Sequence, residues 1–296
     1  MTRNIARAMI ILSAVLWGTS FPVIRMGLQY ISPILFLFLR FSLATMILLI
    51  VLFAKGVRPS LRDIGGLVGL TGVLNAVAYA LQFVGQKFTY ATNAALMINT
   101  SPIFTAIFAH FLLEEKLTKP RAGAIILTFL GASIVILGSS SALKLRVIGD
   151  IICLAAGAIW GLYVAEAKRL REKGIDELEL LFIWFLFVAI LGGVASPLEK
   201  PRILLNIQAI FAVVYTAIMC TVLPFLLWYK ALRSLEASSS SNYFMLEIVV
   251  SALAEAIFLG LDINMLMVLG AILIVVGVYL TDYFYREGGI AYQCRK

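Results

Sequence analysis

Charged residues are scarce in this sequence, and so are the side chains that build metal and redox sites. Asp, Glu, Lys and Arg make up 14% of the 296 residues, against roughly 25% in an average soluble domain. The single histidine cannot supply the two histidines of an HExxH zinc site. The three cysteines stand far apart without a CxxC pair, which excludes a disulfide framework. A glycine-rich phosphate-binding loop is also lacking, so we expect neither an ATP-driven pump nor an enzyme, and no cofactor or metal.

Hydrophobic residues, by contrast, make up 62% of the chain, and the mean hydropathy is +1.00. They form continuous runs of about 20 residues, the length of a helix that crosses roughly 30 Å of hydrocarbon. The runs do not alternate every second residue, which favours helices over the strands of a barrel. The sequence therefore predicts an all-α integral membrane protein with ten transmembrane helices, near 8–28, 34–54, 64–84, 91–112, 121–139, 148–168, 177–197, 206–230, 238–260 and 264–284.

The basic residues predict the orientation of these helices. If the N-terminus is cytoplasmic, 17 of the 24 Lys and Arg residues fall in inner segments and 5 in outer connections, with Arg25 and Arg40 inside helices. Because cytoplasmic loops carry the excess of Lys and Arg, we expect both termini inside the cell. The net charge of +8 is explained by this topology, so nucleic acid is not an expected partner.

The chain repeats itself weakly. Trp17-Gly18 recurs as Trp160-Gly161, Gly131 recurs as Gly277, and the stretch 91–102 has a counterpart at 237–248. Five helices per unit is an odd number, so the second unit enters the membrane from the opposite side. We therefore expect two inverted five-helix repeats, 1–140 and 141–296, with a substrate site near the midplane at their interface.

One carboxylate lies where hydrocarbon is expected. Glu247 is about two residues from the middle of its span, where a charge costs at least a few kcal/mol, so it is a candidate functional residue. Glu247 either exchanges a proton or contacts a substrate ammonium, or it is a protonated residue that holds its helix in place. Arg25, Arg40 and Glu255 lie nearer the outside, where they are expected to form a structural ion-pair cluster or part of a gate.

Several segments resemble a known family. ILSAVLWGTSFPVIRMGL, YATNAALMINTSPIFTAIFAHFLLEEKLT and LEASSSSNYFMLEIVVSALAEAIFLG are similar to the paired EamA domains of the drug/metabolite transporter superfamily. The resemblance implies a ten-helix carrier of the cytoplasmic membrane that exports or exchanges small metabolites such as amino acids. Two positions depart from the family pattern: Ile248 replaces a proline, and Leu261 replaces a glutamate.

Polar and aromatic side chains at mid-membrane depth supply the candidate site. Pro22, Pro102 and Pro224 each free a backbone carbonyl there, those of Gly18, Ile98 and Cys220. Kinked helices at one level favour a cavity, although neighbouring helices can also satisfy such carbonyls. The predicted substrate-binding residues are Trp17, Thr19, Asn75, Tyr79, Gln82, Asn99, Ser101, Trp160, Tyr163, Trp228, Tyr243 and Glu247.

The sequence thus predicts a secondary carrier for small metabolites, possible substrates being amino acids or aromatic and amphipathic compounds. Its expected partners are the lipid bilayer and a small-molecule substrate, with protons as a candidate coupling ion. A membrane channel and a ligand-sensing membrane module remain alternatives, because both also use polar cavities. A monomer and a homodimer are equally compatible with the sequence.

Overall fold

The computed structural model describes residues 2–56, 66–89, 91–138, 146–173, 175–259 and 262–293. The described part consists of helices joined by short connections, with one isolated antiparallel bridge between Ile31 and Ile203. Helices of the first half are α1 (Arg3–Gly18), α2 (Ser20–Gly27), α3 (Pro33–Ala54), α4 (Gly66–Phe88), α5 (Ala91–Ile98), α6 (Ser101–Leu113) and α7 (Lys119–Gly138). Those of the second half are α8 (Val147–Glu172), α9 (Glu177–Ala195), η2 (Ser196–Glu199), α10 (Ile207–Ala217), the π-turn η3 (Ile218–Val222), α11 (Leu223–Ala231), α12 (Ala237–Asn242), η4 (Tyr243–Met245), α13 (Leu246–Leu259) and α14 (Met265–Gln293).

Nine helical segments of the described residues are long and apolar enough to cross a membrane. They correspond to the predicted spans other than 238–260. That remaining span consists of α12, η4 and α13, and it begins with a polar run of four serines and Asn242. The prediction of an all-α, multi-pass membrane protein is confirmed.

The two ends of the chain lie on the same side of the helix bundle. Arg3 and Arg7, at the start of α1, donate hydrogen bonds to Asp282 near the end of α14. We call this side the terminal side and the opposite one the far side. The helices then alternate in direction, so that α1 begins on the terminal side whereas α8, which opens the second half, begins on the far side.

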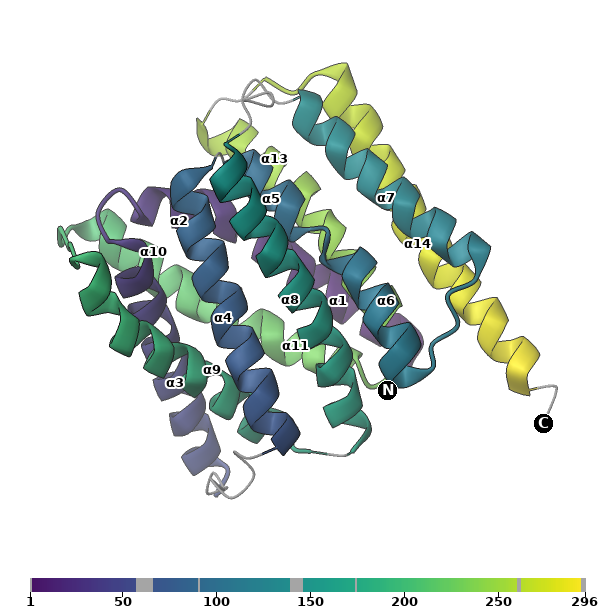
Figure 1. Ribbon diagram of the computed structural model, residues 1–296, viewed down its shortest axis with the longest axis horizontal. Coiled ribbons are helices and arrows are strands. Elements are labelled where there is room, and N and C mark those ends of the chain that lie inside the picture. Colours follow the sequence, from purple (N-terminus) through teal and green to yellow (C-terminus); the bar gives the residue numbers. More distant parts are fainter. Residues whose placement is uncertain are drawn as a thin grey trace.

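Corresponding helices of the two halves pack against each other in opposite directions. Figure 1 shows α7 and α14 side by side along one edge of the molecule. In this pair Gly138 lies beside Met267, and Gly131 lies beside Gly270 and Ile274, so numbering rises along one helix as it falls along the other. In the second pair, α3 and α9, the Phe41 ring contacts Phe185, and Phe38 lies beside Gly192. Antiparallel packing of both pairs is the arrangement that inverted repeats require.

Glycines allow the backbones of α7 and α14 to touch. A Cβ atom added to Gly131 would lie 2.8 Å from both the Gly270 carbonyl oxygen and the Ile274 nitrogen. These are backbone atoms and cannot rotate away. Small residues therefore permit the close contact, as is common between membrane helices.

We predict that Gly131→Ala destabilises the protein by about 1 to 3 kcal/mol, because the added methyl group overpacks this contact. Gly123→Ala on the same helix is the matched control, since nothing lies within 4 Å of its added Cβ. Thermal unfolding of the purified variants in one detergent checks the prediction. Equal melting temperatures for the two variants would contradict it.

Three helix breaks occur close to the prolines. The first span is divided between Gly18 and Ser20, and the fourth between Ile98 and Ser101. In the eighth span, the π-turn Ile218–Val222 directly precedes α11. The first two breaks lie within four residues N-terminal to Pro22 and Pro102, and the π-turn ends two residues before Pro224. Proline removes a backbone donor and clashes with the preceding turn. The breaks surround the middle of the molecule.

Candidate functional site

A cavity of about 80 Å³ lies among these broken helices, between the two halves. Nine of the predicted site residues line it: Trp17, Tyr79, Gln82, Asn99, Ser101, Trp160, Tyr163, Trp228 and Glu247. Seven further residues line it without having been predicted: Ser20, Phe21, Arg40, Ile98, Val164, Phe225 and Phe244. The aliphatic and aromatic members of this second group carry no sequence signal that separates them from ordinary packing residues.

Aromatic rings form much of the cavity wall. Trp17 meets Phe225 and Phe244 edge to face, each at 5.2 Å between ring centroids. Tyr79 meets Trp160 at 4.8 Å, also edge to face. Such arrangements leave ring faces and edges for an apolar or aromatic ligand while contributing about 0.5 to 1.5 kcal/mol per pair.

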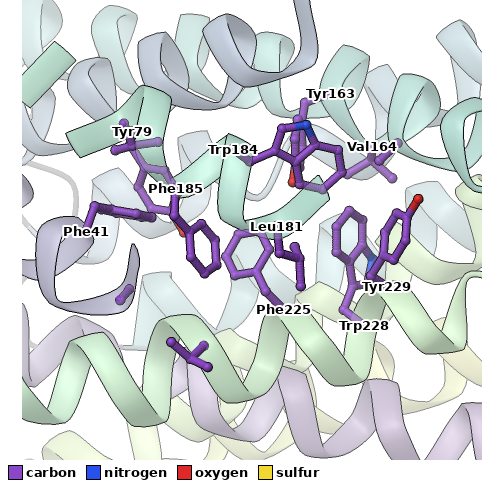
Figure 2. Packing of buried hydrophobic residues seen from close by; sticks show 14 of the residues in the cluster. Phe41, Tyr79, Tyr163, Val164, Leu181, Trp184, Phe185, Phe225, Trp228 and Tyr229 are labelled. Carbon is purple, nitrogen blue, oxygen red and sulfur yellow. The ribbon is translucent and has the colours of Figure 1, made fainter. Parts of the chain in front are cut away.

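On the terminal side of the cavity, further aromatic residues form a packed layer. Figure 2 shows Tyr163, Trp184, Trp228 and Tyr229 grouped together beside Phe225. Tyr163 stacks on Trp228 at 5.8 Å, and Trp184 contacts both Tyr163 and Tyr229. Trp184 also donates a hydrogen bond from Nε1 to Thr71, which ties α9 to α4. This aromatic layer closes the cavity toward the terminal side.

Glu247 is the acidic member of the cavity lining. It follows directly on the break η4, at the second residue of α13. No hydrogen bond or ion pair joins its carboxyl group to another residue in the described part of the chain. Asn99, which also lines the cavity, donates a hydrogen bond from Nδ2 to the Ala95 carbonyl at 2.9 Å. The Glu247 carboxyl is thus available to a ligand or a proton.

Arg40 is the basic member of the lining and does not occupy the predicted position. Its side chain is 1% exposed, and its Nε and Nη2 atoms donate to Thr221 Oγ1 and to the Cys220 carbonyl. Arg25 lies instead in a separate far-side pocket, and the Glu255 side chain lies outside the described part. The expected grouping of Arg25 with Arg40 was wrong, because depth along a helix does not say which neighbouring helix a side chain meets.

Three predicted residues do not reach the cavity. Thr19 lies at the break between α1 and α2, where its hydroxyl donates to Leu16 and contacts Tyr215. Asn75 is fully buried one turn below Tyr79 toward the terminal side, on the part of α4 that the aromatic layer covers. Tyr243 lies beside Arg7 and Asp282. Its predicted alignment with Glu247 assumed a continuous α-helix, and the 3-10 turn η4 breaks that register.

The far side carries a second, wider pocket of about 370 Å³. Its wall includes Arg25 and Gln29 from the end of the first span, Pro33 from α3, and Gln86 and Lys87 from the end of α4. Phe21 lines both this pocket and the central cavity, so the two are adjacent at this residue.

The terminal side is closed by polar contacts in addition to the aromatic layer. Glu115 accepts hydrogen bonds from the backbone N–H groups of Ala237 and Ser238, which ties the end of α6 to the start of α12. Arg171 pairs with Glu177 at 3.3 Å, and its guanidinium lies over the Tyr229 ring at 5.2 Å. These contacts join α8, α9 and α11. The described structure thus has a pocket on the far side of the cavity and packed contacts on the terminal side.

Glu236 lies in the terminal-side connection between α11 and α12. Burial, reinforced by the Glu115 carboxylate, raises the pKa of Glu236 to about 7, although Arg121, Arg3 and Lys168 act in the opposite direction. Because the pKa is raised on folding, the protonated side chain favours the folded state. This contribution is fully present below the pKa of an unfolded glutamate, near 4.5, and is lost as the pH rises through about 7.

We predict that the melting temperature of the purified protein falls between pH 6 and pH 8, and that Glu236→Gln removes part of this fall. Each unit of pKa shift corresponds to about 1.4 kcal/mol, so the effect is measurable. Thermal unfolding across this pH range checks the prediction. The prediction would be contradicted if the melting temperatures of the variant and the parent protein changed in parallel with pH.

Comparisons with known proteins agree with the architecture. The model of the EamA-like transporter family matches residues 4–137 and 147–282. An uncharacterized transporter of Bacillus subtilis is 30% identical, with 88% of each chain covered. A probable amino-acid metabolite efflux pump of Salmonella typhimurium is 24% identical over 94% of this chain and 97% of that one. One crystal structure has the same fold, with a TM-score of 0.84, 18% identity, and coverage of 97% of this chain and 99% of the other. The chain therefore belongs to the EamA-like transporter family.

Proposed function

We propose that this protein is a secondary carrier that moves small amphipathic metabolites across the cytoplasmic membrane by alternating access. The observation that supports this most is the asymmetry of the central cavity. The cavity lies between two antiparallel halves, with a pocket beside it on the far side and packed aromatic and ionic contacts on the terminal side. A carrier caught facing one side of the membrane has this form.

The excess of basic residues supports a cytoplasmic terminal side, and we therefore propose that both termini are inside and that the described state faces outward. We take the two moving units as residues 1–140 and 141–296. Export and exchange both require that the terminal side open in turn. Similarity to a relative named as an amino-acid metabolite efflux pump supports export of amino-acid-like compounds.

The lining supports an aromatic or amphipathic substrate. Trp17, Trp160 and Phe225 offer ring surface, and Gln82 and Glu247 offer polar groups nearby. At about 80 Å³ the cavity is smaller than the 300 to 1,000 Å³ of common ligand pockets. Binding of a phenyl-sized group therefore requires movement of rings such as Phe21, which fits a site that opens and closes.

Counterflow in proteoliposomes tests the proposal. L-Phenylalanine, 3-phenylpropionate and phenethylamine serve as labelled probes, because they present a zwitterion, an anion and a cation on the same ring. A carrier should show saturable uptake of at least one probe, accelerated when the vesicles are preloaded with the unlabelled compound. Uptake that rises linearly without such acceleration would indicate a channel, and saturable binding without flux would indicate a sensor.

A further inference from the structure

Arg40 brings a positive charge into the central cavity that the described residues do not neutralise. The side chain is 1% exposed, and it has no carboxylate within ion-pair distance in the described part of the chain. Its hydrogen bonds there use Nε, at 2.7 Å from Thr221 Oγ1, and Nη2, at 2.8 Å from the Cys220 carbonyl oxygen. The protons of Nη1 and the second proton of Nη2 are left for another partner. A buried charge without a counter-ion is costly, so this arrangement points to a missing anion.

The surrounding chain holds the guanidinium in place through neutral groups. Pro224 cannot donate to the Cys220 carbonyl, and the π-turn η3 presents that carbonyl to Arg40 instead. The Thr221 hydroxyl donates to the Thr216 carbonyl and therefore offers a lone pair to Arg40 Nε. The proline kink and the π-turn thus orient the Arg40 guanidinium and leave its remaining N–H donors free for another partner.

Aromatic rings stabilise the charge without cancelling it. The guanidinium carbon lies 5.4 Å from the centre of the Phe41 ring and 5.6 Å from that of Tyr79. Cation–π contacts offset part of the desolvation cost. These contacts add no hydrogen-bond acceptor, so the N–H groups that Thr221 and Cys220 do not bind stay available to another partner. The planar edge of arginine suits a carboxylate, which accepts two parallel hydrogen bonds.

We propose that the cavity selects organic carboxylates, with the substrate carboxylate bound to the free N–H groups of Arg40 and its apolar part held against Trp17 and Phe225. The inference rests on the proposed carrier function and adds the chemical class of the substrate. A phosphate ester fits less well, because it would bring a second negative charge to a single guanidinium in a cavity that also contains Glu247.

Tryptophan fluorescence of the purified full-length protein tests this selectivity directly, since Trp17, Trp160 and Trp228 line the cavity. The probes are 3-phenylpropionate, its neutral amide 3-phenylpropionamide, and phenethylamine. We expect the carboxylate to bind about ten- to hundredfold more tightly than the amide, as a charge-assisted hydrogen bond implies. Arg40→Gln should remove this preference while leaving amide binding within about twofold, and Arg40→Lys should retain part of it.

Arg25→Gln is the matched control, because Arg25 lies in the far-side pocket and not in the cavity lining. If Arg40→Gln does not fold, as judged by its elution and melting temperature, Thr221→Val replaces it. That variant frees Nε and should lower the carboxylate preference without removing a charge.

Equal affinities for 3-phenylpropionate and its amide in the parent protein would overturn the proposal. Tightest binding of phenethylamine would do so too, and would indicate recognition by Glu247. Failure of every carboxylate from acetate to 3-phenylpropionate to bind would also overturn it. The carrier function is judged separately by counterflow, since trans-stimulated uptake of an amine would support a carrier while refuting carboxylate selection.

Discussion

Replacing Glu247 with glutamine is expected to flatten the pH profile of transport and to slow transport roughly tenfold, which corresponds to about 1.4 kcal/mol in the barrier. The carboxyl group lines the central cavity and has no partner among the described residues. A carboxylate closed off from water is costly, whereas one in a wetted cavity is not. Opening and closing of the cavity can therefore be coupled to release and uptake of a proton at this residue.

Uptake of 3-phenylpropionate into proteoliposomes between pH 5.5 and pH 8 measures this effect. Glu172→Gln is the control, because Glu172 is an exposed residue of α8 that pairs with Lys168 at the surface. The control should keep the rate and pH profile of the parent protein. If Glu247→Gln keeps them as well, Glu247 has no part in coupling and serves only to hold α13.

Arg171→Leu is expected to open the terminal side. Arg171, Glu177 and Tyr229 form what we call the terminal-side latch, which joins the ends of α8 and α11 to the start of α9. Two polar atoms of the latch, Arg171 Nε and Glu177 Oε2, are buried without a hydrogen-bond partner. Such atoms raise the free energy of the closed state, so that a modest change should release it.

The internal repeat of the sequence supports the location of the terminal-side latch. Trp160 follows Trp17 by 143 residues, and within the same helices this offset carries Leu28 to Arg171. Leu28 lines the far-side pocket, whereas its counterpart Arg171 is packed against Glu177 and Tyr229. The latch thus occupies the place where the second half would form an equivalent pocket in the opposite state.

Removal of Arg171 leaves Glu177 partly buried without its cation, at a cost of about 1 to 3 kcal/mol to the closed state, or roughly a ten- to hundredfold change in population. Hydrogen exchange should accelerate accordingly in the last turns of α8 and α11. Glu172→Ala is the control on the same turn of α8. The double variant Arg171→Leu/Glu177→Leu should destabilise the closed state less than Arg171→Leu does, because it leaves no charge unpaired. Unchanged exchange in Arg171→Leu would refute the latch.

Much of the architecture follows from periodicity and spacing in the sequence. The length of the apolar runs predicts the helices, because the thickness of the bilayer fixes the length of a helix that spans it. The odd number of helices per repeat predicts the inversion, and the antiparallel contact of Gly131 with Gly270 agrees with it. Pro102 and Pro224 locate breaks, since proline has a definite effect on the turn before it.

The candidate site was predicted less completely, for two physical reasons. Helical spacing places Tyr243 on the face of Glu247 only if the helix is continuous, and three residues of 3-10 turn rotate it toward Arg7 instead. The sequence predicts Arg40 in an outer ion-pair cluster, whereas the structure places it in the lining of the central cavity. Its partners, Thr221 and the Cys220 carbonyl, lie about 180 residues away, and no local pattern reports a contact over that separation.

Spin-label distances in nanodiscs test the central claim most directly, because they need no knowledge of the substrate. One pair, at Gln29 and Lys87, spans the far-side pocket, and a second, at Lys173 and Lys230, spans the terminal-side ends of α8 and α11. Compared with the parent protein, Arg171→Leu should lengthen the terminal-side distance and shorten the far-side distance. A longer terminal-side distance with an unchanged far-side distance would contradict alternating access and leave only local loosening.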